Sequence, residues 1–510
     1  MIISLSVLVI TIIVSGTYAL YKAQLSKNIG VNTTTHGLAY YINYVKGTDI
    51  TAATLNPSTS YEGGASSDIE FWKKDDSYDI YGKIELTVNT IGTNLSNSPA
   101  LKYAVVNNGN VLKEGSLKGT TSGSKVTILK NLYLEQTKQI YTVYVWLDNS
   151  EELGNISNES LSISVDCTAS LQKEPTAADT IISLYTSAAK VTATNNSITY
   201  NTAPSVSLMN DRLGGTTTDL DGGNIRYYGA NPNNYIYFNC SDYSNQTSST
   251  CETWRIIGVF DGKLKLIRGS QIGKYSWDNK NTSTGAENDA GKNDWTTARL
   301  MKLLNPSNYY KVDSNDNNLG QSLYYNSASG KCYSGQNNAT VDCDFTSTGI
   351  KNAETRNMIA ETTYNLGGWN SNSVYSNQIY EYERGTTVYS GRPTTWKGKI
   401  ALAYPSDYGY AADLNQCKDK TLYDYDNRTC TSNNWMKAII TNNGSNTGWL
   451  LTPNSGNSYY AWYVDSVGYV SNYSIAYSAF GAVPVLSLSS ELGIESGGDG
   501  SSSKPYKLSA

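Results

Sequence analysis

Six of the seven cysteines of this 510-residue chain form three closely spaced pairs, and this spacing restricts how the chain can fold. The members of the pairs are 11, 11 and 13 positions apart, and each pair brackets a polar segment. These pairs are Cys240 with Cys251, Cys332 with Cys343, and Cys417 with Cys430. We expect local disulfides that hold surface loops, each contributing about 2–3 kcal/mol when unstrained. Free thiols in a reducing compartment are the alternative, but the regular pairing favours an oxidising location outside the cytoplasm.

Composition also favours an exported, β-rich protein over a cytosolic enzyme. Charged residues make up only 16% of the chain, and Tyr (42) far outnumbers Phe (5), so hydroxyl and amide groups must cover much of the surface. The net charge is −5 and no basic run is present, so the electrostatic footprint of a nucleic-acid-binding protein is missing.

Catalytic motifs are not found in the sequence. His36 is the only histidine, and it lies in a polar run typical of a solvated loop. Nucleophile activation of the Ser-His-Asp or Cys-His type needs an imidazole, and most zinc sites use histidine or clustered cysteine. There is also no C-x-x-C, phosphate-binding glycine loop or G-x-S-x-G motif. We therefore predict a protein that is not an enzyme, with no catalytic residues, metal site or cofactor.

Residues 1–21 contain no charged side chain and are rich in Ile, Leu and Val. About 20 such residues suffice to cross a bilayer. The segment is interpreted as a membrane anchor or as a signal peptide, for which Thr17-Tyr18-Ala19 offers a cleavage option. In both cases the rest of the chain is expected to be extracellular, either secreted or attached to the cell surface.

Residues 22–170 show the alternation of apolar and polar side chains that is typical of strands. Ile84, Leu86 and Val88 alternate with polar residues, and Asn108-Gly109 is a hairpin signal between two strand-like runs. We predict a β-sandwich. Cys167 lies on an apolar face and is interpreted as a buried thiol.

Residues 171–223 are assigned to a helix and a linker. Ile181, Leu184, Tyr185 and Ala188 have helical spacing, which predicts a helix over Pro175–Ala189. The segment Val191–Asn234 is rich in Thr, Asn, Gly and Ser and is interpreted as a linker or irregular loop. Within it, Asp219, Asp221 and Asn224 favour a turn over a calcium site.

Residues 224–490 are predicted to form an α+β domain, and residues 491–510 a tail that is flexible over Gly497–Ser503. Asp313–Asn318 begins like a calcium loop but lacks the glycine and glutamate that such loops need. The predicted elements are a strand at Tyr235–Asn239, a hairpin of Trp254–Phe260 and Lys263–Arg268, a helix from Asn293 or Asp294 to Leu304 in which Trp295 packs, a helix at Ala353–Leu366 and a strand at Ile400–Tyr404.

The stretch Gly448–Ser490 contains the candidate site. Its ends are apolar and strand-like, and its middle is rich in tyrosine spaced by Ser, Asn and Gly. Aromatic rings supply contact area at low entropic cost, and small polar residues supply hydrogen bonds. A meander whose rings pack only on each other is the alternative. The predicted ligand-binding residues are Tyr459, Tyr460, Trp462, Tyr469, Asn472, Tyr473 and Tyr477.

The same stretch resembles the C-terminal part of bacterial C-type-lectin-like domains. The matching residues are Trp449, Pro453, the hairpin Val464–Val470 and the strand Val483–Leu488. The resemblance extends back to about Asn224 and implies the fold shared by the formylglycine-generating enzyme and the variable proteins of diversity-generating retroelements. The enzyme branch depends on a reactive cysteine pair. The first third, through Gly16–Tyr21 and the predicted sandwich, weakly resembles secreted matrix-fibre and camelysin-like proteins.

The sequence therefore predicts a mainly β, adhesin-like or receptor-like surface protein that binds a glycan or protein through its C-terminal domain. A structural subunit of surface fibres, self-assembling through the sandwich, is one alternative, and an enzyme of the formylglycine-generating type is another. The expected partners are a glycan or protein ligand and, through the N-terminal helix, a membrane.

Overall fold

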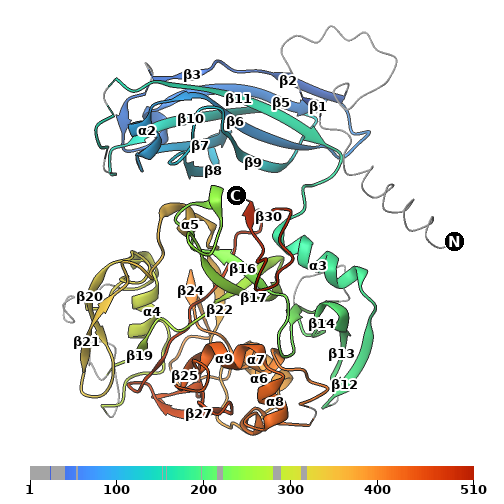
Figure 1. The fold of residues 1–510 in the computed structure, drawn as a ribbon, viewed down its shortest axis with the longest axis vertical. Helices are drawn as coiled ribbons and strands as arrows, with labels where there is room; N and C mark the ends of the chain where they lie inside the picture. The colour runs from blue at the N-terminus through green and yellow to red at the C-terminus, as the bar shows by residue number, and fades with distance from the viewer. Residues whose placement is uncertain are drawn as a thin grey trace, which may run out of the picture. The chain divides into compact units, whose positions relative to one another are not determined.

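The computed structural model describes residues 23–24, 41–52, 55–151, 153–156, 158–196, 198–214, 222–279, 289–311, 319–417 and 419–509 (Figure 1). The predictions made for Met1–Tyr21, His36, Asp219, Asp221 and Asp313–Asn318 lie outside these residues. Within them, no helix has the length and hydrophobicity needed to cross a membrane. The chain divides into two compact units, Met1–Glu174 and Pro175–Ala510.

The first unit contains two sheets, as the alternation predicted. In order across the sheet, the first consists of β1 (Ala23–Gln24), β11 (Leu161–Ser170), β6 (Tyr81–Ile91) and β9 (Lys125–Tyr133), with β3 (Ile50–Thr51) also on β11. The second consists of β2 (Ile42–Val45), β5 (Ala65–Lys73), β10 (Ile140–Asp148), β7 (Leu101–Asn107) and β8 (Asn110–Ser116), with β4 (Pro57–Ser58) also on β10.

One core joins the two sheets of this unit. Leu86 of β6 and Val143 of β10 are fully buried in the same apolar cluster, which makes the unit sandwich-like. Asn108 and Gly109 both have positive φ and close the predicted β7–β8 hairpin. Cys167 is a buried free thiol, and burial raises its pKa well above the ordinary value, so it is poorly reactive.

The second unit contains a nine-stranded sheet and a five-stranded sheet. The nine-stranded sheet runs β12 (Val191–Asn195), β13 (Ile198–Ala203), β14 (Leu208–Asn210), β15 (Ile225–Tyr227), β17 (Glu252–Phe260), β18 (Lys263–Arg268), β29 (Val485–Ser487) and β24 (Ile400–Ala401), with β16 (Tyr235–Phe238) on β17. The five-stranded sheet runs β19 (Lys274–Ser276), β28 (Ala479–Gly481), β25 (Gly448–Pro453), β26 (Tyr460–Val464) and β27 (Val470–Ile475).

Short helices and two-stranded ribbons complete this unit. The helices are α3 (Ala177–Ser187), α4 (Arg299–Leu304), α5 (Ala353–Met358), α6 (Ser376–Glu383), α7 (Pro405–Tyr410), α8 (Arg428–Ser432) and α9 (Trp435–Ile440). The ribbons are β20 (Ser329–Tyr333) with β21 (Thr340–Asp344), β22 (Thr362–Asn365) with β23 (Thr395–Gly398), and β30 (Gly493–Ile494) with β31 (Leu508–Ser509). Helix α6 packs on α7, and α7 packs on β25 (Figure 1).

Several predicted elements are confirmed in this unit. Helix α3 forms, and the side chains of Thr176 and Asp179 make a reciprocal capping box at its start. The β17–β18 hairpin turns at Asp261-Gly262, both with positive φ. Trp295 is buried and packs against Trp277, with ring centroids 5.1 Å apart, as expected of a packing residue.

The predicted linker is wrong. Val191–Tyr227 contributes β12, β13, β14 and β15 to the nine-stranded sheet. Its short strands are rich in Thr and Asn, so the alternation of apolar and polar side chains that marks a strand is hard to see. In addition, β15 pairs with β17, which lies further along the chain, so this pairing forms only in the folded unit.

The two central helices were also predicted with wrong bounds. Helix α5 ends at Met358, and Thr362–Asn365 pairs with Thr395–Gly398 as a strand, because β-branched and aromatic residues suit a strand with a partner. Helix α4 begins only at Arg299, so neither Asn293 nor Asp294 caps it.

The predicted flexible tail is instead part of the fold. Tyr506 and Leu508 are buried; the Tyr506 amide donates to the Tyr235 carbonyl, and the Tyr506 carbonyl accepts from the Tyr237 amide. The Gln246 side chain donates to the Leu508 carbonyl at 2.7 Å and accepts from the Leu508 amide at 2.9 Å. One buried amide thus satisfies both backbone groups of Leu508.

We predict that Gln246→Ala lowers the free energy of unfolding of the second unit by about 2–3 kcal/mol, because two buried backbone groups lose their partner. Denaturant unfolding followed by tryptophan fluorescence measures this, since eight of the ten tryptophans lie in the second unit. Gln336→Ala, at an exposed position, is the control. Equal midpoints for both variants would contradict the role of Gln246.

Candidate functional site

The β26–β27 hairpin carries most of the predicted ligand-binding residues. Tyr460 pairs with Ile475 at its open end, and Val464 pairs with Val470 next to its turn. The Asp465 carboxylate accepts a hydrogen bond from the Val467 amide in that turn. Strand β26 also pairs with β25, so the hairpin is part of the five-stranded sheet.

Three rings form a partly exposed group that we call the tyrosine cluster: Tyr459, Tyr460 and Tyr473. Ring centroids are 4.8 Å apart for Tyr459 and Tyr460, and 5.9 Å apart for Tyr460 and Tyr473, both with edge-to-face geometry. Tyr473 is 54% exposed, and the other two are half-buried. Burial, followed by the effect of neighbouring Tyr459, raises the pKa of Tyr460, so its hydroxyl stays uncharged.

Two more of the predicted tyrosines lie away from this cluster. Tyr469 lies next to the hairpin turn. Its ring centroid is 5.3 Å from that of Tyr423 and 6.5 Å from that of Tyr463. Tyr477 lies between β27 and β28, where its carbonyl accepts a hydrogen bond from Ser276. Both are half-buried, so the structure separates the predicted residues into more than one group.

Trp462 and Asn472 are wrongly predicted as ligand-contacting residues, because both side chains are fully buried. The β26–β27 register shifts between Ala461 and Tyr463. Ala461 and Trp462 nevertheless lie on opposite faces of β26, because they belong to two different apolar clusters, and both faces are covered at this point. Alternation in the sequence could not reveal that both faces of this strand are covered.

Two asparagines, the buried Asn293 and the half-buried Asn457, hold the backbone under the tyrosine cluster, and no pattern in the sequence indicated this role. The Asn293 side chain donates to the carbonyls of Asn454, Asn457 and Tyr460 at 2.7–2.9 Å. The Asn457 side chain accepts from the amides of Tyr459 and Tyr460. These contacts are made to backbone groups, so they fix the position of the tyrosines without involving the rings.

The segment Gly368–Ser373, between β22 and α6, runs beside the hairpin. The Trp369 carbonyl accepts a hydrogen bond from the Asn472 side chain at 3.3 Å, and the Asn370 carbonyl accepts one from the Tyr473 hydroxyl at 3.5 Å. The Trp369 ring stacks on Tyr382 of α6, with centroids 3.9 Å apart and planes 5° apart. No motif in the sequence indicated this segment.

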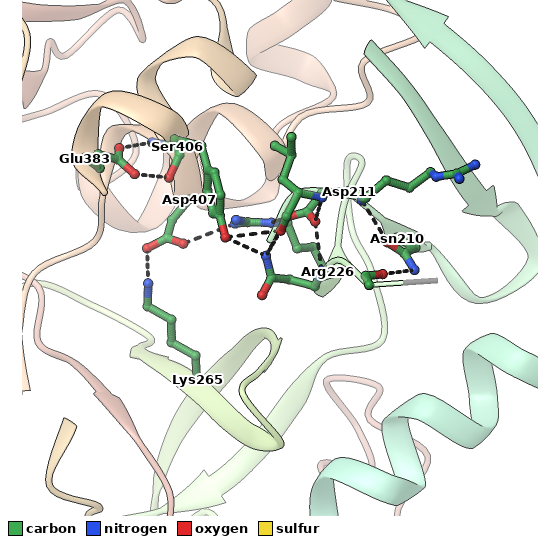
Figure 2. A network of polar contacts seen from close by, with 12 residues as sticks. Asn210, Asp211, Arg226, Lys265, Glu383, Ser406 and Asp407 are labelled. Atoms are coloured by element: carbon green, nitrogen blue, oxygen red, sulfur yellow. Dashed lines mark hydrogen bonds and ion pairs between the residues drawn. The ribbon is translucent and has the colours of Figure 1, made fainter. Parts of the chain in front are cut away.

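A buried network of charges fixes α6 and α7 against the nine-stranded sheet (Figure 2). Asp407 of α7 accepts from Arg226 of β15 at 3.2 Å and from Lys265 of β18 at 2.5 Å. Arg226 also donates to Asp211 at 2.6 Å. Two carboxylates thus balance two cations, and all four are at least 90% buried. Burial opposes ionisation of Asp407, but Lys265 and Arg226 hold its pKa below the ordinary value.

Glu383, at the end of α6, joins this helix to α7. Its carboxyl accepts from the Ser406 amide at 2.9 Å and the Ser406 hydroxyl at 2.5 Å (Figure 2). Complete burial raises its pKa from 4.5 to about 7, although Arg384 and Ser406 act in the opposite direction. Helix α6 also carries Tyr382, so the charge network supports the helix that supports Trp369.

Two concave features of the second unit are too small for an organic ligand. One is lined by Tyr200, Tyr375 and Tyr425, and the other by Tyr275, Arg299 and Leu303. Each has a volume of about 10 Å³, which is room for one water molecule.

All three predicted disulfides are confirmed. Cys240–Cys251, Cys332–Cys343 and Cys417–Cys430 are bonded, so the second unit contains no free cysteine pair of the kind that the formylglycine-generating branch uses. In the described parts of the chain, no three metal-ligating side chains come together.

No known protein family and no curated protein matches this chain. Among solved structures, the chain is similar to one from the quasi-atomic PBCV-1 virus capsid, at 11% sequence identity and a TM-score of 0.12. The similarity covers 43% of this chain and 59% of that chain. A TM-score this low carries no argument about fold or function.

We predict that Asp407→Asn lowers the free energy of unfolding by about 3–5 kcal/mol, because it leaves the buried Lys265 without its counter-charge, while Arg226 keeps Asp211. Denaturant unfolding of the full chain measures the change. Lys397→Met, which removes the exposed ion pair with Glu361, is the control and should change stability little. An Asp407→Asn variant as stable as this control would show that the network is not needed for the fold.

We also predict a pH dependence from Glu383. Its raised pKa means that the folded protein keeps this proton to higher pH than the unfolded chain, so this group stabilises the fold less as pH rises from 4.5 to about 7. Relative to Glu383→Gln, the free energy of unfolding of the wild type should fall by about 3 kcal/mol over this pH range. Unfolding measured at several pH values tests this, with Glu381→Gln, exposed on the same helix, as the control. Parallel profiles for wild type and Glu383→Gln would contradict it.

Proposed function

We propose that this protein binds an extracellular glycan or protein through the tyrosine cluster on the β26–β27 hairpin. The observation that carries the proposal is the geometry of the three rings. They touch edge to face, Tyr473 is 54% exposed, and the side chains of Asn293 and Asn457 hold the backbone beneath them. Tyr469 and Tyr477 are candidates for peripheral contacts.

The energetic argument rests on preorganisation. A ring already held by its neighbours loses little conformational freedom when a ligand binds, so more of the contact energy appears as affinity. Each phenol also offers a donor and an acceptor beside an apolar face, and this combination suits recognition. The burial of Trp462 and Asn472 removes two residues from the predicted contact set but gives the hairpin a fixed base.

An extracellular location is consistent with the three disulfides, which form in oxidising compartments. We further propose that the second unit is C-type-lectin-like. The order β25, β26, β27, β28 and β29 along the chain, with the hairpin and the final strand where the resemblance places them, supports this. An adhesin-like or receptor-like role follows from these two proposals.

We predict that Tyr460→Ala and Tyr473→Ala each weaken binding about tenfold, because aromatic residues at the centre of a contact surface commonly contribute more than 1 kcal/mol. The assay is binding of the purified full chain to a glycan array and to a panel of bacterial and animal cells. Tyr78→Ala is the matched control, because Tyr78 is 45% exposed and lies in the first unit.

Melting temperatures near that of the wild type must accompany the loss of binding, so that misfolding is excluded. Binding that survives in both cluster variants would overturn the proposed site. Loss of binding in Tyr78→Ala alone would instead assign recognition to the first unit.

A further inference from the structure

We propose that the segment Gly368–Ser373 forms the second half of this binding surface, and that the ligand is a neutral carbohydrate. This inference rests on the proposed function, because it shares the tyrosine cluster. It adds a second chain segment to the site and selects one ligand class.

The contacts place the segment beside the cluster. The Tyr473 hydroxyl donates to the Asn370 carbonyl, and the Asn372 side chain donates to the Ser471 hydroxyl at 3.4 Å. Gly456 lies against Asn370, since a Cβ added at Gly456 would come within 2.9 Å of the Asn370 side chain. The Asn370 side chain itself is exposed next to Tyr473.

The base of the segment is rigid. The Trp369 carbonyl accepts from both the Asn472 side chain and the Ser455 amide. A Cβ at Gly368 would meet the Pro453 carbonyl oxygen at 2.2 Å, so the two backbones are in close contact there. The exposed side-chain amide of Asn370 is therefore carried by a backbone that other contacts already hold in position.

The surface carries almost no charge. Residues 362–380 contain no Asp, Glu, Lys or Arg, and residues 439–490 contain only Asp465, in the hairpin turn. Arg392 reaches the edge of the surface, where it donates to the Ser458 carbonyl and the Asn293 side chain. A charged group bound over the centre of the surface, at Tyr473 and Asn370, would lose its hydration without contacting a charged side chain of either segment, and this is costly. A neutral ligand avoids that cost.

The scarcity of exposed aliphatic side chains on this surface also favours a carbohydrate over a protein. Among the described residues of 362–380 and 439–490, Val467 is an exposed aliphatic side chain. It lies at the hairpin turn, at the opposite end of β26 from Tyr460. Protein interfaces usually have an apolar core. Here the tyrosine rings are accompanied by polar side chains of the two segments, the exposed Asn370 and the half-buried Ser371 and Ser455. A sugar presents the complementary pattern, with C–H faces for the rings and hydroxyls for the amides.

The test is an array of neutral oligosaccharides (glucans, mannans, galactans and N-acetylhexosamine oligomers) beside sialylated, sulfated and uronic-acid oligosaccharides. We expect the full chain to bind neutral members, and Asn370→Ala to weaken that binding about fivefold, as for loss of one hydrogen bond. Asn326→Ala, exposed elsewhere in the same unit, should bind like the wild type. Unchanged melting temperatures confirm that both variants are folded.

The other outcomes separate this inference from the proposed function. Binding only to acidic oligosaccharides, or cell binding that is abolished by protease and survives periodate, overturns the neutral-carbohydrate assignment. The proposed function then stands if Tyr473→Ala still weakens the interaction. Neutral-sugar binding that Asn370→Ala leaves intact overturns the role of the Gly368–Ser373 segment. No binding to any glycan or cell overturns both proposals.

Discussion

Asp407 makes the contact on which the second unit depends. Its two oxygens join α7 to β15 through Arg226 and to β18 through Lys265, and all three side chains are excluded from water. Buried charges are tolerated when they are balanced and hydrogen-bonded, and Asp211 completes that balance on the far side of Arg226. Removal of any one member leaves an uncompensated charge in the interior, so the elements can assemble in only a few ways.

The consequences of this contact extend to the outer surface. Glu383 and Ser406 join α6 to α7, and α6 carries Tyr382, on which Trp369 stacks. The segment that follows Trp369 lies beside Tyr473. A chain of packed and hydrogen-bonded residues thus leads from the buried charges to the tyrosine cluster. A surface held in this way is preorganised, and a preorganised surface loses less entropy when it binds a partner.

Asparagine has an unusual share in this architecture. Asn293 donates to three carbonyls beneath the hairpin, Asn457 orients the backbone of two tyrosines, and Asn472 joins the hairpin to Trp369. A buried amide can both donate and accept, so it joins irregular segments whose backbone groups have no ladder partner. These side chains hold the backbone, while the rings above them pack on one another and Tyr473 contacts Asn370.

Local signals in the sequence were sufficient for the three disulfides, helix α3, the Asn-Gly hairpin and the Asp-Gly hairpin, because each depends on residues close together in the chain. The strands of the first unit were also predictable, because apolar and polar side chains alternate along them, although their pairing joins distant segments. The strands of Val191–Tyr227, the packed tail and the inward turn of Trp462 were not accessible in this way. They depend on partners that are distant in the chain. The tyrosine-rich stretch is therefore a property of the sequence. Which of its side chains are exposed, and which segment lies beside them, was decided only by tertiary structure, because elements from elsewhere in the chain pack on both faces of the hairpin.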